Sequence, residues 1–116
     1  MTVTVYGIRN CDTMKKAFAW LDSHGVEYRF HDYRREGVPV DRLAAWAKSV
    51  GWARLANTRG PTWRKIPDEA KDGLDEARAL RLLEAHSSAI RRPVVEYGRK
   101  ILVGFDAAEY ARALGQ

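Results

Sequence analysis

The sequence predicts an α/β domain built on a mixed four-stranded sheet, and three observations lead to this prediction. Residues 2–6 and 26–33 alternate β-branched or aromatic residues with polar ones, on either side of a stretch with helical periodicity. Two further strand-like segments, residues 93–96 and 100–103, flank a short turn. Between these ends, residues 38–88 show only helical patterns. All four strands can share one sheet covered by helices.

The first third predicts a parallel strand–helix–strand unit. From Asp12 onward apolar residues recur at i, i+3, i+4 and i+7, which is one face of a helix: Met14, Ala17, Phe18 and Leu21. Gly25 marks the end of this helix, before the second strand. Two strands joined through a helix run parallel, with a right-handed crossover.

The middle of the chain predicts short helices and loops. We expect a helix over residues 39–51, one more turn over 52–56, a polar loop over 57–62, a short helix over 68–72, and a longer helix capped by Asp75. This stretch has no strand pattern, so we treat residues 38–88 as an all-helical insert.

The last third predicts a hairpin followed by a helix. Asp106 and Glu109 have the spacing of a capping box, with Asp106 as the cap. The element order is therefore βαβ, helical insert, ββα, which is the plan of a thioredoxin-like fold with an insertion. We predict a single domain over residues 1–116.

Composition excludes several classes of protein. Hydrophobic residues make up 46% and charged residues 30% of the 116 residues, which is globular usage. No apolar run approaches the roughly 20 residues that span a membrane. The first six residues lack a secretory pattern, so we expect a cytoplasmic protein with no membrane partner. The net charge of +5 comes from scattered basic pairs, which does not favour nucleic acid as a partner.

Cys11 is the candidate for chemistry. As the only cysteine it cannot form an internal disulfide, and it stands between a strand end and a helix start. Free N–H groups and the helix dipole stabilise a thiolate at that place. Arg9 and Lys15 are close enough to Cys11 in sequence for their positive charges to add to the electric field that favours the thiolate. The alternative is that Cys11 is a small buried apolar side chain without chemistry.

The sequence predicts that Cys11 acts without a second cysteine. Met14 occupies the position where dithiol oxidoreductases carry their second cysteine, and it also belongs to the apolar helix face. A single thiol cannot resolve its own mixed disulfide. We therefore expect an outside thiol, glutathione or a glutaredoxin, as partner, and no tightly bound cofactor. The histidines are isolated along the chain, so we expect no metal site.

Four segments resemble the ArsC/Spx/YffB family in order along the whole chain. They are residues 5–17 (VYGIRNCDTMKKA), 57–65 (NTRGPTWRK), 90–95 (IRRPVV) and 102–105 (LVGF). The set is most similar to the YffB branch. The resemblance implies a thioredoxin-like fold with a helical insert, and it implies that Cys11 is the nucleophile.

The resemblance also implies an anion site beside the cysteine. In the arsenate reductases of this family three arginines surround the thiol; two align here with Arg59 and Arg92, and the third with Gly104. A site with fewer cations holds a doubly charged oxyanion less well, which favours a disulfide substrate over arsenate. The bond between Arg92 and Pro93 is expected to be cis. The remaining residues that we assign to the substrate site are Asn10 and Asp12, with Arg9, Lys15 and Pro93 in supporting positions.

Two functions follow from these expectations. The first is a monothiol oxidoreductase that acts on an oxyanion such as arsenate or on a disulfide, with glutathione as co-substrate. The second is an adapter of the Spx kind that contacts RNA polymerase. Many such adapters sense oxidants through a Cys-x-x-Cys pair, and Met14 breaks that pair. Direct nucleic-acid binding, suggested by the net charge, is a third and weaker hypothesis.

Overall fold

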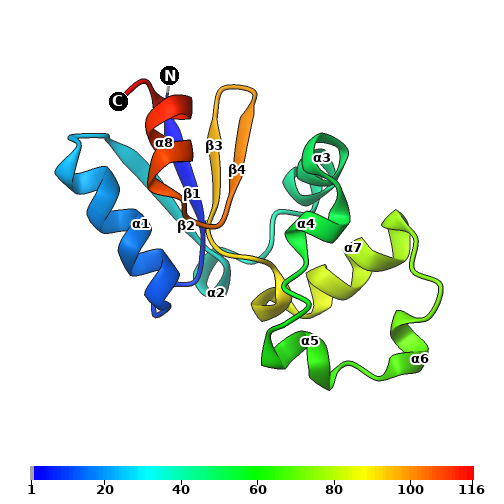
Figure 1. Ribbon diagram of the computed structural model, residues 1–116. Helices are drawn as coiled ribbons and strands as arrows, with labels where there is room; N and C mark the ends of the chain where they lie inside the picture. Colours follow the sequence, from blue (N-terminus) through cyan, green and yellow to red (C-terminus); the bar gives the residue numbers. More distant parts are fainter. Residues whose placement is uncertain (1) are drawn as a thin grey trace. The chain divides into compact units, whose positions relative to one another are not determined.

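The computed structural model describes residues 2–116 and contains a mixed four-stranded sheet of order β2-β1-β3-β4 (Figure 1). β1 (Val3–Gly7) and β2 (Tyr28–Asp32) run parallel, while β3 (Val94–Tyr97) is antiparallel to both β1 and β4 (Lys100–Val103). With the helices this gives the predicted βαβ and ββα pieces. The predicted fold class, a thioredoxin-like α/β fold, is confirmed.

The chain divides into two compact units. The first joins the chain up to Gly37 with Arg92–Gln116 and contains the whole sheet; the second is Val38–Arg91. The helices of the first unit are α1 (Asp12–Ser23), α2 (Tyr33–Glu36) and α8 (Ala107–Leu114). The second unit contains α3 (Val40–Val50), α4 (Trp52–Leu55), α5 (Pro61–Lys65), α6 (Asp68–Lys71), α7 (Glu76–Ala85) and the 3₁₀ turn η1 (Ser87–Ala89). The single domain expected over residues 1–116 stays a prediction.

The predicted caps are present. The side chain of Asp106 accepts a hydrogen bond from the Glu109 N–H at 3.0 Å, and that of Asp75 accepts one from the Arg78 N–H at 2.9 Å. Each carboxylate satisfies one of the free donors at a helix start, which fixes where α8 and α7 begin.

Two local predictions are wrong. The loop expected over residues 57–62 ends early, because α5 begins at Pro61; proline is favoured in a first helical turn, where no N–H is needed. The second strand, expected to run through Tyr33, ends at Asp32. There the Asp32 carboxylate accepts from the Arg34 N–H at 3.0 Å and starts the short helix α2.

The main core of the first unit lies on one face of the sheet. Alternate residues of β1, β3 and β4 point to this face, where they meet the apolar faces of α1 and α8. Figure 1 shows α1 and α8 next to the sheet. The fully or largely buried members of this core are Val3, Val5, Met14, Ala17, Leu21, Val95, Leu102, Tyr110 and Leu114.

The strand register brings distant parts of the chain to one edge of the sheet. The last residue of β1, Gly7, pairs with the last residue of β2, Asp32, and Tyr6 pairs with Val94 at the start of β3. β4 ends beside that same residue, because Val103 pairs with Val94. Four connections therefore leave or enter the sheet at this edge.

Within the described residues, none of the helices combines the length and the apolar character that crossing a membrane requires.

Gly7 leaves space that Met14 fills. A Cβ added at Gly7 would lie 2.5 Å from the Met14 sulfur and 2.8 Å from its terminal methyl, and the Met14 side chain is fully buried. The end of the Met14 side chain therefore occupies the space that a side chain at position 7 would need.

We predict that Gly7→Ala lowers the free energy of unfolding by about 1–3 kcal/mol, the usual cost of overpacking a core. Chemical denaturation measures it. In a Met14→Val background, which lacks both clashing atoms, the same change should cost less. An equal cost in both backgrounds would contradict the packing explanation.

Candidate active site

Cys11 caps the N-terminus of α1. Its backbone is extended, with φ −144° and ψ 134°, and its carbonyl accepts the first helical hydrogen bond from the Lys15 N–H at 3.0 Å. Its thiol is partly buried and packs against the edge of the sheet core. This is the predicted place between β1 and the first helix of the chain.

Opposing effects act on the pKa of the Cys11 thiol, and the net result is a lowered pKa. Burial raises it. Hydrogen bonding by the backbone N–H groups of Met14 and Thr13 lowers it, and Arg92 lowers it further through its charge and as a donor to the sulfur. The groups that favour the thiolate outweigh its desolvation. A larger fraction of the sulfur is therefore thiolate near neutral pH than in an unstructured peptide.

Arg92, which lowers the pKa of Cys11, lies just before the start of β3. The peptide bond between Arg92 and Pro93 is cis, as expected. Pro93 is fully buried and its carbonyl accepts from the Gly104 N–H at 2.8 Å, while Arg92 is half-buried. The arginine is thus carried by a backbone segment tied to the end of β4.

The other residues assigned to the site from the first unit lie at its surface. Asn10, Asp12 and Lys15 are exposed around the cysteine. Arg9 is exposed too, and its guanidinium carbon lies 5.2 Å from the centre of the Phe30 ring, a cation–π contact. None of these side chains is among the groups that shift the Cys11 pKa, so their roles stay predictions.

Arg59 belongs to the second unit. It is exposed in the turn before α5, where the Gly60 N–H donates to the Asn57 carbonyl at 3.1 Å. The turn is fixed to η1, because the Asn57 N–H donates to the Ala89 carbonyl at 2.8 Å. A role for Arg59 in binding an anion stays a prediction.

The backbone at Gly104 is unsuited to a larger residue. Its φ is +80°, a conformation that residues with a side chain rarely adopt. Its carbonyl accepts a hydrogen bond from the Tyr110 hydroxyl at 2.6 Å. The position that the resemblance aligns with a family arginine therefore has a backbone conformation that favours glycine.

Sequence reasoning missed Tyr33. The side chain is 4% exposed, and its hydroxyl has no hydrogen-bond partner in the part of the chain that the structure describes. Arg92 lowers the pKa of Cys11, and it also lowers the pKa of Tyr33 against the larger effect of burial. The available signal was positional: Tyr33 directly follows β2, and β1 and β2 end at the same edge because they are parallel.

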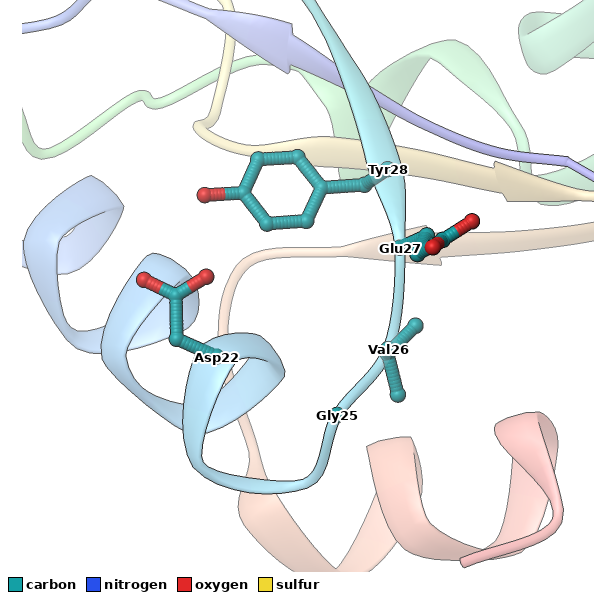
Figure 2. Close-up of a pocket in the computed structure, with 5 residues that line it drawn as sticks. All are labelled: Asp22, Gly25, Val26, Glu27 and Tyr28. Atoms are coloured by element: carbon teal, nitrogen blue, oxygen red, sulfur yellow. The ribbon is translucent and has the colours of Figure 1, made fainter.

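An open pocket lies at the other end of the strands. Figure 2 shows its lining residues, where α1 turns into β2: Asp22, Gly25, Val26, Glu27 and Tyr28. Burial and the Asp22 carboxylate raise the pKa of the Tyr28 hydroxyl. This pocket contains no thiol and is separated from Cys11 by the length of α1. Residues 2–116 hold no cluster of three or more potential metal-ligating side chains.

Comparison with known proteins places this geometry in a family. The model of the ArsC family matches residues 6–113, which includes Cys11, Arg59 and Arg92. The chain belongs to the ArsC family.

Several relatives of this ArsC-family chain are known. The solved structure of a YffB protein is 48% identical, with a TM-score of 0.95 over 97% of this chain and 99% of that one. An arsenate reductase (ArsC) related protein from Brucella melitensis is 45% identical, with a TM-score of 0.77 over 100% and 97%. An uncharacterized Haemophilus influenzae protein is 41% identical over 96% and 97%, and the global transcriptional regulator Spx of Listeria innocua 25% over 97% and 86%.

We predict that Arg92→Gln raises the Cys11 pKa, because the thiolate loses a charge and a donor. In the native chain the rate of alkylation should rise with pH through a midpoint below that of a cysteine in an unstructured peptide, and in Arg92→Gln that midpoint should move upward. Because the chain has one cysteine, the signal reports Cys11 alone. Arg99→Gln, an exposed arginine in the hairpin turn, is the control and should leave the midpoint unchanged.

We predict that Gly104→Ala lowers the free energy of unfolding by about 1–2 kcal/mol, the cost of a positive φ for a residue with a side chain. Gly104→Arg should be destabilised at least as much. Thermal or urea denaturation of both variants checks this. A variant as stable as the native chain would show that the backbone relaxes without strain.

Proposed function

We propose that this chain is a monothiol reductase in which Cys11 is the nucleophile and glutathione, directly or through a glutaredoxin, is the reductant. The observation that carries the proposal is the place of the partly buried Cys11 at the N-terminus of α1, where nearby backbone N–H groups and Arg92 lower the pKa of its thiol. Perturbed pKa values of this kind cluster at functional sites. The relatives named as arsenate reductase related support a reductase role.

The proposed reaction on a glutathione mixed disulfide has two exchange steps. The Cys11 thiolate attacks the glutathione sulfur; a bond forms between the two sulfurs, and the substrate leaves as a thiolate that takes up a proton. A second glutathione thiolate then attacks the Cys11–glutathione disulfide. Oxidised glutathione leaves, and the Cys11 thiolate is regenerated. Met14 cannot carry out this second step, so an outside thiol is needed.

The arginines serve the anionic parts of the substrate in this proposal. A guanidinium presents a planar fork that fits a carboxylate or an oxyanion. In this proposal Arg92 stabilises the Cys11 thiolate and binds the group that it attacks, and Arg59 binds a second anionic group of the substrate. With glycine at position 104 the site offers less positive charge for arsenate, so we propose a glutathione mixed disulfide as the preferred substrate and arsenate as a poorer one.

The decisive test compares Cys11→Ser with the native chain in a coupled assay that follows oxidised glutathione. On a small glutathione mixed disulfide, Cys11→Ser should lose activity to background, because a hydroxyl does not exchange with a disulfide. Arsenate, tested in parallel, should turn over more slowly. Native activity in Cys11→Ser would exclude the proposed nucleophile.

The arginine assignment has its own prediction. Arg59→Ala should raise KM for the mixed disulfide several-fold with little effect on the Cys11 pKa, since it is assigned to the substrate alone. Arg54→Ala, an exposed arginine of the same unit, is the control. Unchanged KM in Arg59→Ala would remove it from the site.

A second candidate is an Spx-like adapter, favoured by the 25% identity with the regulator of Listeria innocua. In that case the family fold would serve as a surface for RNA polymerase. Capture of purified RNA polymerase by the native chain and equally by Cys11→Ser, without reductase activity, would support the adapter.

A further inference from the structure

The Tyr33 hydroxyl is an unusual group for a protein interior. It is buried and has no hydrogen-bond partner among the described residues, although buried polar groups are nearly always paired. Leaving such a group unpaired costs stability. A phenylalanine would fill the same space without that cost, so the hydroxyl needs an explanation.

The groups around Tyr33 show what could pair with it. The Tyr33 ring lies 6.1 Å from the ring of His31, and the charged or ionisable groups that act on its hydroxyl are Tyr6, Arg92 and Glu96. The Glu96 carboxylate already accepts a hydrogen bond from the Tyr6 hydroxyl at 2.7 Å. Burial strongly raises the pKa of Tyr33, so the phenol stays neutral and can accept a hydrogen bond. Among these groups the guanidinium of Arg92 carries the most donors.

Arg92 lowers the pKa of both Cys11 and Tyr33. Its guanidinium acts on the Cys11 sulfur by charge and hydrogen bonding, and it acts by charge on the Tyr33 hydroxyl. The strand register explains this, since Cys11 follows the end of β1, Tyr33 the end of β2, and Arg92 precedes β3, all at one edge. In the reduced chain the guanidinium favours the charge of the Cys11 thiolate, and the phenol is left unpaired among the described residues.

We propose that Tyr33 is a positioning residue that accepts a hydrogen bond from Arg92 once the Cys11 sulfur has become part of a disulfide. The inference rests on the proposed function, because a disulfide at Cys11 is its intermediate. When the thiolate attacks, its electron pair forms the new sulfur–sulfur bond and its negative charge leaves with the departing thiolate. Arg92 then loses its anionic partner.

The unpaired phenol gives the half-buried guanidinium a new acceptor at that moment. Because Tyr33 has no existing hydrogen bond to break, the exchange costs nothing on its side. The new bond stabilises the mixed disulfide relative to the reduced chain. When an outside thiol regenerates the Cys11 thiolate, Arg92 returns to the sulfur and Tyr33 is again unpaired.

The test uses Tyr33→Phe, which removes only the hydroxyl, and a probe that needs no substrate site. Methyl methanethiosulfonate converts the Cys11 thiolate to a methyl disulfide and releases methanesulfinate. The unfolding equilibrium of the native chain and of Tyr33→Phe is measured in urea, with Cys11 reduced and with Cys11 modified.

In the reduced state Tyr33→Phe should be at least as stable as the native chain, because it lacks an unpaired buried hydroxyl. In the modified state its unfolding equilibrium constant should be about tenfold larger than that of the modified native chain, from the loss of one hydrogen bond to a charged donor. The alkylation midpoint of Cys11 should be unchanged in Tyr33→Phe.

Two controls make the result specific. Tyr97→Phe removes a tyrosine hydroxyl at the far end of β3 and should have the same effect in both sulfur states. In an Arg92→Gln background the state-dependent effect of Tyr33→Phe should disappear. An effect of Tyr33→Phe that is equal in both states, or that survives Arg92→Gln, would overturn the proposal.

The outcome is separable from that of the proposed function. A state-dependent effect in a chain without reductase activity would retain the Arg92–Tyr33 exchange and reject the reductase. Full reductase activity without a state-dependent effect would do the reverse.

Discussion

The proposed chemistry of this chain depends on the free energy of placing a negative charge on the Cys11 sulfur. Partial burial opposes the charge, while two backbone N–H groups and the Arg92 guanidinium favour it, and the favourable contributions prevail. A desolvated anion repays its cost only when hydrogen bonds and an opposite charge meet it together. For that reason both the backbone N–H groups at the start of α1 and the side chain of Arg92, which is distant in sequence, favour the charge on the Cys11 sulfur.

The sheet supplies this meeting point. Parallel pairing of β1 with β2 and antiparallel pairing of β1 with β3 place two strand ends and one strand start at one edge. Three of the four connections at this edge carry a polar group: Cys11 after β1, Tyr33 after β2 and Arg92 before β3. The buried apolar residues on the strands and on α1 hold the register, since a shift by one residue would turn every side chain to the other face. The core thus fixes the electrostatics of the site.

The sequence could predict what depends on local patterns. The period of two in β1, the helical period from Asp12 and the cap at Asp106 are local signals, and each element formed where they indicated. It could not predict α2, because Asp32 acts as a cap only after β2 has ended. The role of Tyr33 was hidden for a related reason: the pattern placed it inside a strand, and an unpaired hydroxyl is a property of the packed structure. The partnership of Arg92 with Cys11 was implied by family resemblance, because no local pattern joins residues so far apart.

The single-thiol character of the site is also a property of the core. Met14 stands one helical turn after Cys11, where a second thiol would make a dithiol, but its side chain is fully buried and fills the space beside Gly7. A cysteine there would leave most of that space empty, and a buried thiol has a raised pKa that makes it a poor nucleophile. Conversion to a dithiol would therefore require a repacked junction between β1 and α1 as well as a new sulfur. In the proposed function, the need for an outside thiol follows from the packing of the Met14 side chain beside Gly7.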